Sequence, residues 1–172
     1  MPIARQFRPF YRGPGWEFAR RRTLERAGGR FAGKGERDAR GRFAREGQYK
    51  GGARCEHCGR PDGQRVFTWS WKEPARAWGK QPVLQMVWAD ERSGALRDKL
   101  GRLWSGKLPR GFPRHPMVRL QCAHLNHIPG DDGPGNVVAL CGWCHTDHDR
   151  AEHARNRGEH KDLKRPALAG AA

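Results

Sequence analysis

The chain has 172 residues, of which 36% are hydrophobic, and its 34 Lys and Arg against 18 Asp and Glu give a formal net charge of +16 at pH 7. This length fits one domain of ordinary size, or a smaller domain with appendages. The excess of positive charge predicts a polyanionic partner. No apolar stretch approaches the 18 or so residues of a membrane span, and arginines stand where a signal peptide has its apolar core. We therefore expect an intracellular, cytoplasmic protein with no membrane partner.

The first 50 residues carry more than half of the net charge, with 14 Lys and Arg against 5 Asp and Glu. Only 18–27 has the composition of a short helix, and the rest lacks the apolar rhythm of a helix or a strand. We expect an extended basic arm over 1–50, partly disordered when free; a tail that only aids solubility is the alternative. The predicted phosphate-binding set combines this arm with a proline-punctuated loop at 106–116: Arg20, Arg21, Arg22, Arg110 and Arg114.

The middle of the chain is rich in tryptophan. Alternation over 66–71 and an apolar run at 83–89 predict two strands. Three leucines and Trp104 follow helical spacing over 95–104, which predicts an amphipathic helix there. No internal repeat is evident. Further along, apolar stretches at 117–122 and 137–140 flank a Gly/Pro/Asp loop, and we expect a helix from about 142 to 155 and a tail over 156–172.

Four of the five cysteines form two Cys-x-x-Cys pairs, Cys55 with Cys58 and Cys141 with Cys144. The two-residue spacing lets both thiolates of a pair point at one ion from a tight turn, and four thiolates suit tetrahedral Zn²⁺ at a closed structural site. A redox pair or an iron–sulfur cluster is the alternative. Cys122 is unpaired in an apolar stretch, so we expect a small buried hydrophobe.

Histidines and polar residues gather between 118 and 149. His124 closes an apolar stretch, Asn136 follows the loop, and His145 comes directly after the last paired cysteine. If the chain is helical from 142 onward, His145, His148 and Asp149 share one helix face.

This arrangement resembles the HNH endonuclease family, whose core is the ββα-metal fold. The run AHLNHIPGDDGPGNVVALCGWCH matches the shape of the family motif, with its three letters at His124, Asn136 and His145, and CEHCG at 55–59 resembles the partner zinc knuckle of many members. The resemblance implies an α+β fold: a small zinc-stabilised ββα-metal core over 51–155, with a Trp-rich insertion at about 61–117, behind the extended basic N-terminal arm.

The same resemblance implies a metal-dependent endonuclease or nickase that hydrolyses DNA phosphodiester bonds, with double-stranded DNA as partner. His124 would be the general base, Asn136 would orient the loop and the base, and His145 would hold a catalytic Mg²⁺ or another divalent ion. Stand-alone members of this size often come from phages or mobile elements, and some work beside a packaging motor. A protein partner in a larger complex is therefore a further expectation.

The sequence departs from the family at one position. Many members carry a metal-ligating Asp directly before the base histidine, and this chain has Ala123 there. The ion then needs another ligand, for which Asn126, His127, His148 and Asp149 are the candidates. Ala123 also keeps open the alternative of a catalytically silent zinc-stabilised protein that binds nucleic acid or serves in an assembly.

A second register of the motif is available, because Asn126-His127-Ile128-Pro129 also looks like the family's Asp-His-Ile-x-Pro. If His127 were the base, Asn126 would take the place of the missing Asp. We prefer His124, because its 12-residue gap to Asn136 fits the short-loop form of the motif.

Overall fold

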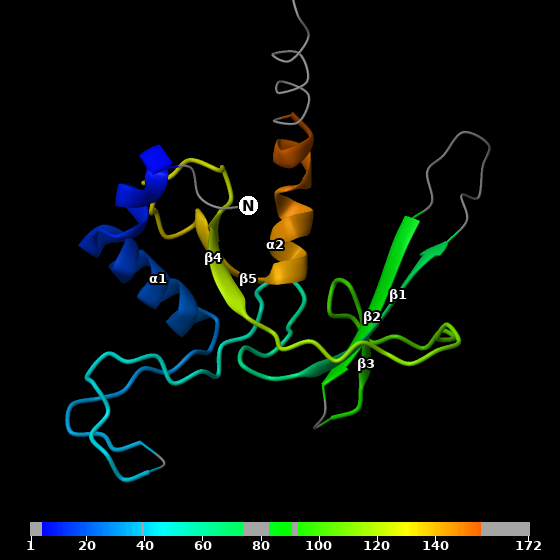
Figure 1. Ribbon diagram of the computed structural model, residues 1–172, viewed down its shortest axis with the longest axis horizontal. Helices are drawn as coiled ribbons and strands as arrows, with labels where there is room; N and C mark the ends of the chain where they lie inside the picture. Colours follow the sequence, from blue (N-terminus) through cyan, green and yellow to red (C-terminus); the bar gives the residue numbers. More distant parts are fainter. Residues whose placement is uncertain (1–4, 39, 74–82, 91–92, 156–172) are drawn as a thin grey trace, which may run out of the picture.

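The computed structural model describes residues 5–38, 40–73, 83–90 and 93–155. The elements in chain order are η1 (Arg5–Tyr11), α1 (Pro14–Arg26), β1 (Val66–Glu73), β2 (Val83–Asp90), β3 (Leu96–Asp98), β4 (Leu120–His124), β5 (Val137–Cys141) and α2 (Gly142–His148). The fold is α+β with two small antiparallel sheets, one of three strands in the order β1-β2-β3 and one formed by β4 and β5 (Figure 1). Within the described ranges, no helix is long and apolar enough to span a bilayer.

The β4–β5 hairpin lies between α1 and α2 (Figure 1). Because successive side chains of a strand point to opposite faces, each strand contributes to two cores. Val137 and Ala139 pack with α1, whereas Val138 and Leu140 pack with the four paired cysteines at the start of α2. The helix expected from about 142 is present: α2 ends at His148, and helical residues resume over 150–155.

Part of the segment expected to be a basic arm is built into this core. Helix α1 begins at Pro14, a residue whose fixed φ suits the first turn, and it starts four residues before the predicted short helix. Its buried residues include Trp16 and Leu24, which pack against Val137 and Ala139 respectively. Helix α1 therefore buries apolar side chains against the hairpin in addition to carrying positive charge.

Residues 30–38 and 40–51 form an irregular two-stranded ribbon that extends away from the hairpin (Figure 1). Its strands are joined by backbone hydrogen bonds such as Ala32 N–H to the Gln48 carbonyl (2.8 Å), and by a bridge between Phe31 and Tyr49. Glycines with positive φ, including Gly41 at 76°, make its turns. Frequent glycine turns break the alternation by which a strand is recognised, so this pairing has no two-residue periodicity in the sequence.

The tip of this ribbon and the loop after β3 form the same turn. Residues 37–42 read RDARGR and residues 97–102 read RDKLGR. In both, an oxygen of the aspartate (Asp38 or Asp98) accepts hydrogen bonds from the backbone N–H groups two and four residues later. The final arginine of each segment pairs with that aspartate, and the first donates to the glycine carbonyl. The expectation that nothing repeats in the chain is therefore wrong for this short motif.

The strands expected near 66–71 and 83–89 are confirmed as β1 and β2, which pair antiparallel from Val66–Asp90 to Glu73–Val83. The helix expected over 95–104 is wrong, because β3 and the turn after it occupy this segment. Leu100 and Leu103 are 40% and 75% exposed, so their helical spacing does not mark a buried face.

Candidate metal centres

The four free cysteines of the two Cys-x-x-Cys motifs converge at one point between the two sheets. Their sulfur atoms all lie within 4.8 Å of one another, all four residues are buried, and the Sγ atoms of Cys58 and Cys141 are 3.7 Å apart. That separation agrees with the edge of about 3.8 Å expected of a tetrahedron with Zn–S bonds of about 2.3 Å. Hydrogen bonds from the other thiols, Cys144 first, lower the pKa of the Cys141 thiol, which favours a thiolate in the cluster. The donor set is thus compatible with a structural metal ion such as zinc.

Two basic side chains contact this cluster. Arg60 is 4% exposed and points one guanidinium nitrogen at Cys141 Sγ (3.6 Å), while His57 Nδ1 lies 3.3 Å from Cys144 Sγ. Four thiolates around one Zn²⁺ leave a net charge of −2, so a buried guanidinium beside them offsets part of that charge. Neither His57 nor Arg60 is among the site residues that the sequence predicted.

His124, the last residue of β4, lies on the face of the strand opposite α2. His124 follows Cys122 on the face toward α1, whereas Ala123 belongs to the core around the four paired cysteines. Position 123, directly before His124, therefore faces α2, but its side chain is only a methyl group.

His124 occupies an aromatic pocket beneath α1. Its side chain is 3% exposed, its ring centroid lies 5.1 Å from that of Trp16, and Nε2 donates a hydrogen bond to Asp132 Oδ1 at 2.8 Å. This partner fixes the ring, and the burial separates the imidazole from bulk water. Asp132 comes from the Gly/Pro/Asp loop, and nothing in the sequence indicated its contact with His124.

A second cluster of metal-ligating side chains lies on the α2 side. Ligand atoms of His127, His148 and Asp149 are all within 4.8 Å of one another. The rings of His127 and His148 stack with centroids 4.5 Å apart, and His127 Nδ1 is 3.6 Å from Asp149 Oδ1. His127 has a φ of 58°, a left-handed conformation that non-glycine residues adopt sparingly. This backbone turn brings His127, a loop residue, next to His148 and Asp149 on the α2 side of the hairpin, where the side chain of Ala123 offers no ligand.

Hydrogen bonds prepare two histidines of this region to bind a cation. His148 Nε2–H donates to the backbone carbonyl of His124 (3.2 Å), which leaves Nδ1 with a free lone pair. His145 Nδ1–H donates to Gln121 Oε1 (2.5 Å), so its Nε2 lone pair faces Asp149 Oδ2 at 3.2 Å. Burial lowers the pKa of His145, which favours the neutral form that binds metals. His145 Nε2 and Asp149 Oδ2 are both acceptors, so a cation or a proton between them is needed to make the contact favourable.

Asn126 and Asn136 lock the loop between the two strands. Asn136 donates from Nδ2 to the Asp131 carbonyl (2.7 Å) and to Asn126 Oδ1 (2.9 Å), and its own oxygen accepts the Asn126 backbone N–H. Asn126 Nδ2 donates to Asp131 Oδ2 at 2.6 Å. The structure thus places Asn136 where it orients the loop, whereas Asn126 does not join the group formed by His127, His148 and Asp149.

The arginines proposed from the sequence as phosphate contacts fall into two groups. Arg20, Arg110 and Arg114 are exposed, and none of them pairs with a carboxylate in the described part of the chain. Arg21 pairs with Glu25, and Arg22 donates to the Asp132 carbonyl, so both serve contacts within the molecule.

No family model, curated protein or solved structure matches the chain. The four-cysteine cluster and the cluster of His127, His148 and Asp149 are therefore the features on which a functional interpretation rests. The first is buried and offers only sulfur, as a structural site does. The second is partly exposed and offers nitrogen and oxygen, the ligands of a site that admits a substrate.

Proposed function

We propose that this protein is a zinc-stabilised, divalent-metal-dependent nuclease of the HNH type that hydrolyses phosphodiester bonds in DNA. The observation that carries the proposal is the placement of His127, His148 and Asp149 within ligand distance of one another. His127 comes from the loop after β4, and the other two follow Cys144 by about one helical turn. The resemblance of residues 118–149 to the HNH motif supports the same chemistry.

The ligands of the proposed catalytic ion are His127, His148 and Asp149, and the Nε2 lone pair of His145, 3.2 Å from Asp149 Oδ2, offers the same ion a further nitrogen. A divalent ion at this position supplies a Lewis acid for a phosphoryl oxygen and lowers the pKa of a bound water molecule. A catalytic ion must be accessible to substrate and water. The side chains of His127 and Asp149 are 30% and 21% exposed, so an ion bound between them would be accessible.

Of the two registers of the motif, the geometry supports His127 over His124. His127 lies at the exposed edge of the cluster with Nδ1 toward Asp149, where it can bind an ion or accept a proton from water. His124 is covered by Trp16 and held by Asp132, so reaching a substrate requires α1 to move. We assign His127 to the reaction centre and His124 to the attachment of α1.

The substrate class follows from charge. A net charge of +16 and the exposed guanidinium groups of Arg20, Arg110 and Arg114 favour a polyanion. Phosphate contacts of this kind give affinity without sequence preference, and they weaken as salt rises.

The test is cleavage of a supercoiled plasmid by the zinc-loaded chain with Mg²⁺, Mn²⁺ or Ni²⁺, beside His127→Ala and His124→Ala. We expect metal-dependent nicking that His127→Ala abolishes and that His124→Ala retains in the fraction of molecules that fold. Loss of activity only in a folded His124→Ala variant would place the reaction centre at His124 instead. Salt-sensitive DNA binding without cleavage under any metal would replace the nuclease by a silent nucleic-acid-binding or assembly protein.

A further inference from the structure

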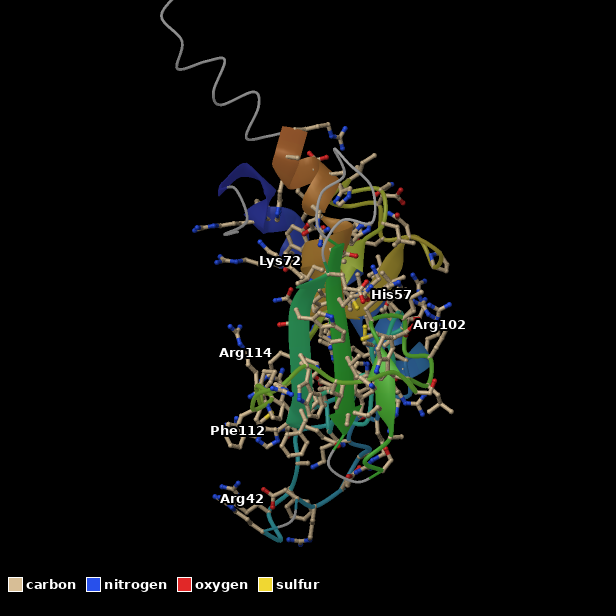
Figure 2. All side chains as sticks on the ribbon, turned by 90° about the vertical axis from the view of Figure 1, so that its right-hand side faces the viewer. Arg42, His57, Lys72, Arg102, Phe112 and Arg114 are labelled. Carbon is tan, nitrogen blue, oxygen red and sulfur yellow. The ribbon has the colours of Figure 1, made fainter. Side chains whose placement is uncertain are left out.

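A cavity of about 360 Å³ lies between β1, the segment 114–119 and the start of α2. The segment runs along the edge of β1, held by two backbone hydrogen bonds between Arg114 and Thr68 (2.8 and 2.9 Å). Figure 2 shows Arg114 on the β1 side of the sheet, across from Arg102, which follows β3. The volume falls within the range of about 300–1,000 Å³ typical of small-ligand pockets.

The inner wall of this cavity is mainly apolar but contains unsatisfied polar groups. Val66 and Met86 are 1% and 2% exposed and provide apolar surface. Arg60, which is 4% exposed, also lines the cavity, and its Nε has no hydrogen-bond partner among the described residues. The Thr68 hydroxyl is likewise buried without a partner within that part of the chain. Buried polar atoms of this kind are costly unless a ligand or water pairs with them.

The mouth of the cavity combines positive charge with apolar and aromatic surface. Arg114 and Arg119 are exposed at the mouth, and neither pairs with a carboxylate in the ranges that the structure describes. Met117 is 41% exposed beside them, and the Trp143 ring is half-buried in the wall. A planar base fits the apolar wall, and guanidinium groups at the mouth fit its phosphates.

The cavity adjoins the proposed metal centre through one shared side chain. Gln121 lines the cavity, and its Oε1 accepts the hydrogen bond from His145 Nδ1. His145 in turn faces Asp149. A strand whose phosphate lies at Asp149 therefore has the cavity next to it, on the Gln121 side.

We propose that this cavity binds an unpaired nucleotide of the nucleic-acid strand that lies across the metal centre. The base inserts against Trp143, Met117 and the apolar wall, and its flanking phosphates contact Arg114 and Arg119. This inference rests on the proposed function, and it adds that the preferred substrate has a single-stranded or unstacked base beside the scissile phosphate.

Binding of a labelled eight-nucleotide thymidine oligonucleotide to the zinc-loaded full chain tests the cavity, with no other divalent ion present. Arg119→Ala removes a cation at its mouth, and Arg102→Ala removes the same charge from an exposed position after β3, outside the lining. Ser70→Phe fills the mouth without changing charge, and Ser105→Phe makes the same change elsewhere on the surface. Zinc content and circular dichroism confirm that each variant folds.

We expect Arg119→Ala and Ser70→Phe each to weaken single-strand binding about five-fold or more, as loss of a stacked base does, while both control variants change it less than two-fold. A fully paired duplex of the same length should respond alike to Arg119→Ala and Arg102→Ala. Single-strand binding that is unchanged by Ser70→Phe, or equally weakened by both controls, would overturn the cavity proposal. Such a result leaves plasmid cleavage intact, whereas failure of the nuclease proposal removes cleavage itself.

Discussion

Single residues around Asp149 determine what the second cluster can bind. The carboxylate faces His127 with one oxygen and His145 with the other, and Gln121 fixes the tautomer of His145. Partners of this kind orient metal ligands, and their loss typically lowers metal affinity by about 10–100-fold. Gln121 is therefore a positioning residue for Asp149 as well as part of the cavity wall.

Replacement of Gln121 by Leu should lower the affinity of the zinc-loaded protein for Mn²⁺ about ten-fold, because His145 loses the hydrogen bond that directs its Nε2 at Asp149. Calorimetric titration measures this affinity. Gln64→Leu, which makes the same change just before β1, is the matched control and should bind Mn²⁺ as the wild type does. Equal affinities in the two variants would show that Gln121 does not position the site.

At this scale the sequence predicted the cysteine cluster in full and the second cluster in part. A Cys-x-x-Cys spacing fixes local geometry, so both pairs could be recognised without knowing the fold. The helical spacing of His148 and Asp149 was equally local. The burial of His124 could not be predicted locally, because it depends on which side of the hairpin α1 covers. The composition of the α1 segment indicated only a basic arm.

Among the elements, α1 contributes most to the apolar face of the hairpin opposite α2. Leu24 is 3% exposed against Ala139, and the Thr23 hydroxyl donates to the Val137 carbonyl. Arg26 forms a two-point ion pair with Glu56 in the first zinc knuckle and also donates to Val137. Removing residues 1–50 would therefore expose the hairpin core, and it would not isolate the charge of this segment.

Leu24→Ala should destabilise the zinc-loaded protein by about 2–5 kcal/mol, because it leaves a cavity between α1 and β5. Phe18→Ala on the same helix removes a larger side chain that is 66% exposed, and it should change stability by less than about 0.5 kcal/mol. Urea unfolding followed by tryptophan fluorescence measures both. Similar losses for the two variants would show that α1 is not docked on the hairpin.

Local patterns predicted the strands β1 and β2 and the helices α1 and α2 but failed over 95–104. There an aspartate-centred turn places Leu100 and Leu103 at helical spacing without burying them. The turn chemistry of Asp98 and Gly101 is visible in the sequence, and its earlier copy at 37–42 could have identified it. Hydrophobic periodicity alone gave the wrong structure because neither leucine is in the core.

For the whole molecule, the cysteine cluster joins parts of the chain that otherwise share little core. Val66 and Trp88 come from the three-stranded sheet, Leu140 comes from the hairpin, and all three pack around the four sulfur atoms. Binding of structural zinc is worth about 10–16 kcal/mol near neutral pH, comparable to the entire stability of a small domain. Metal binding and folding should therefore be coupled.

Chelation of zinc should remove the near-ultraviolet circular dichroism of the buried tryptophans and much of the far-ultraviolet signal. Re-addition of one equivalent of Zn²⁺ should restore both, because the four thiolates recover their common partner. A zinc-free sample with native spectra in both regions would refute a structural zinc site.

A divalent ion bound at Asp149, separately from zinc, would distinguish the proposed nuclease from a silent zinc protein. Mn²⁺ titration of the protein loaded with one zinc, followed by electron paramagnetic resonance, tests it on the wild type, Asp149→Asn and Asp147→Asn. Asp147 is the matched control, because it lies in α2 two residues before Asp149 and pairs with Arg150 outside the cluster. We predict one Mn²⁺ site that Asp149→Asn removes and Asp147→Asn retains; unchanged Mn²⁺ binding by Asp149→Asn would contradict the account.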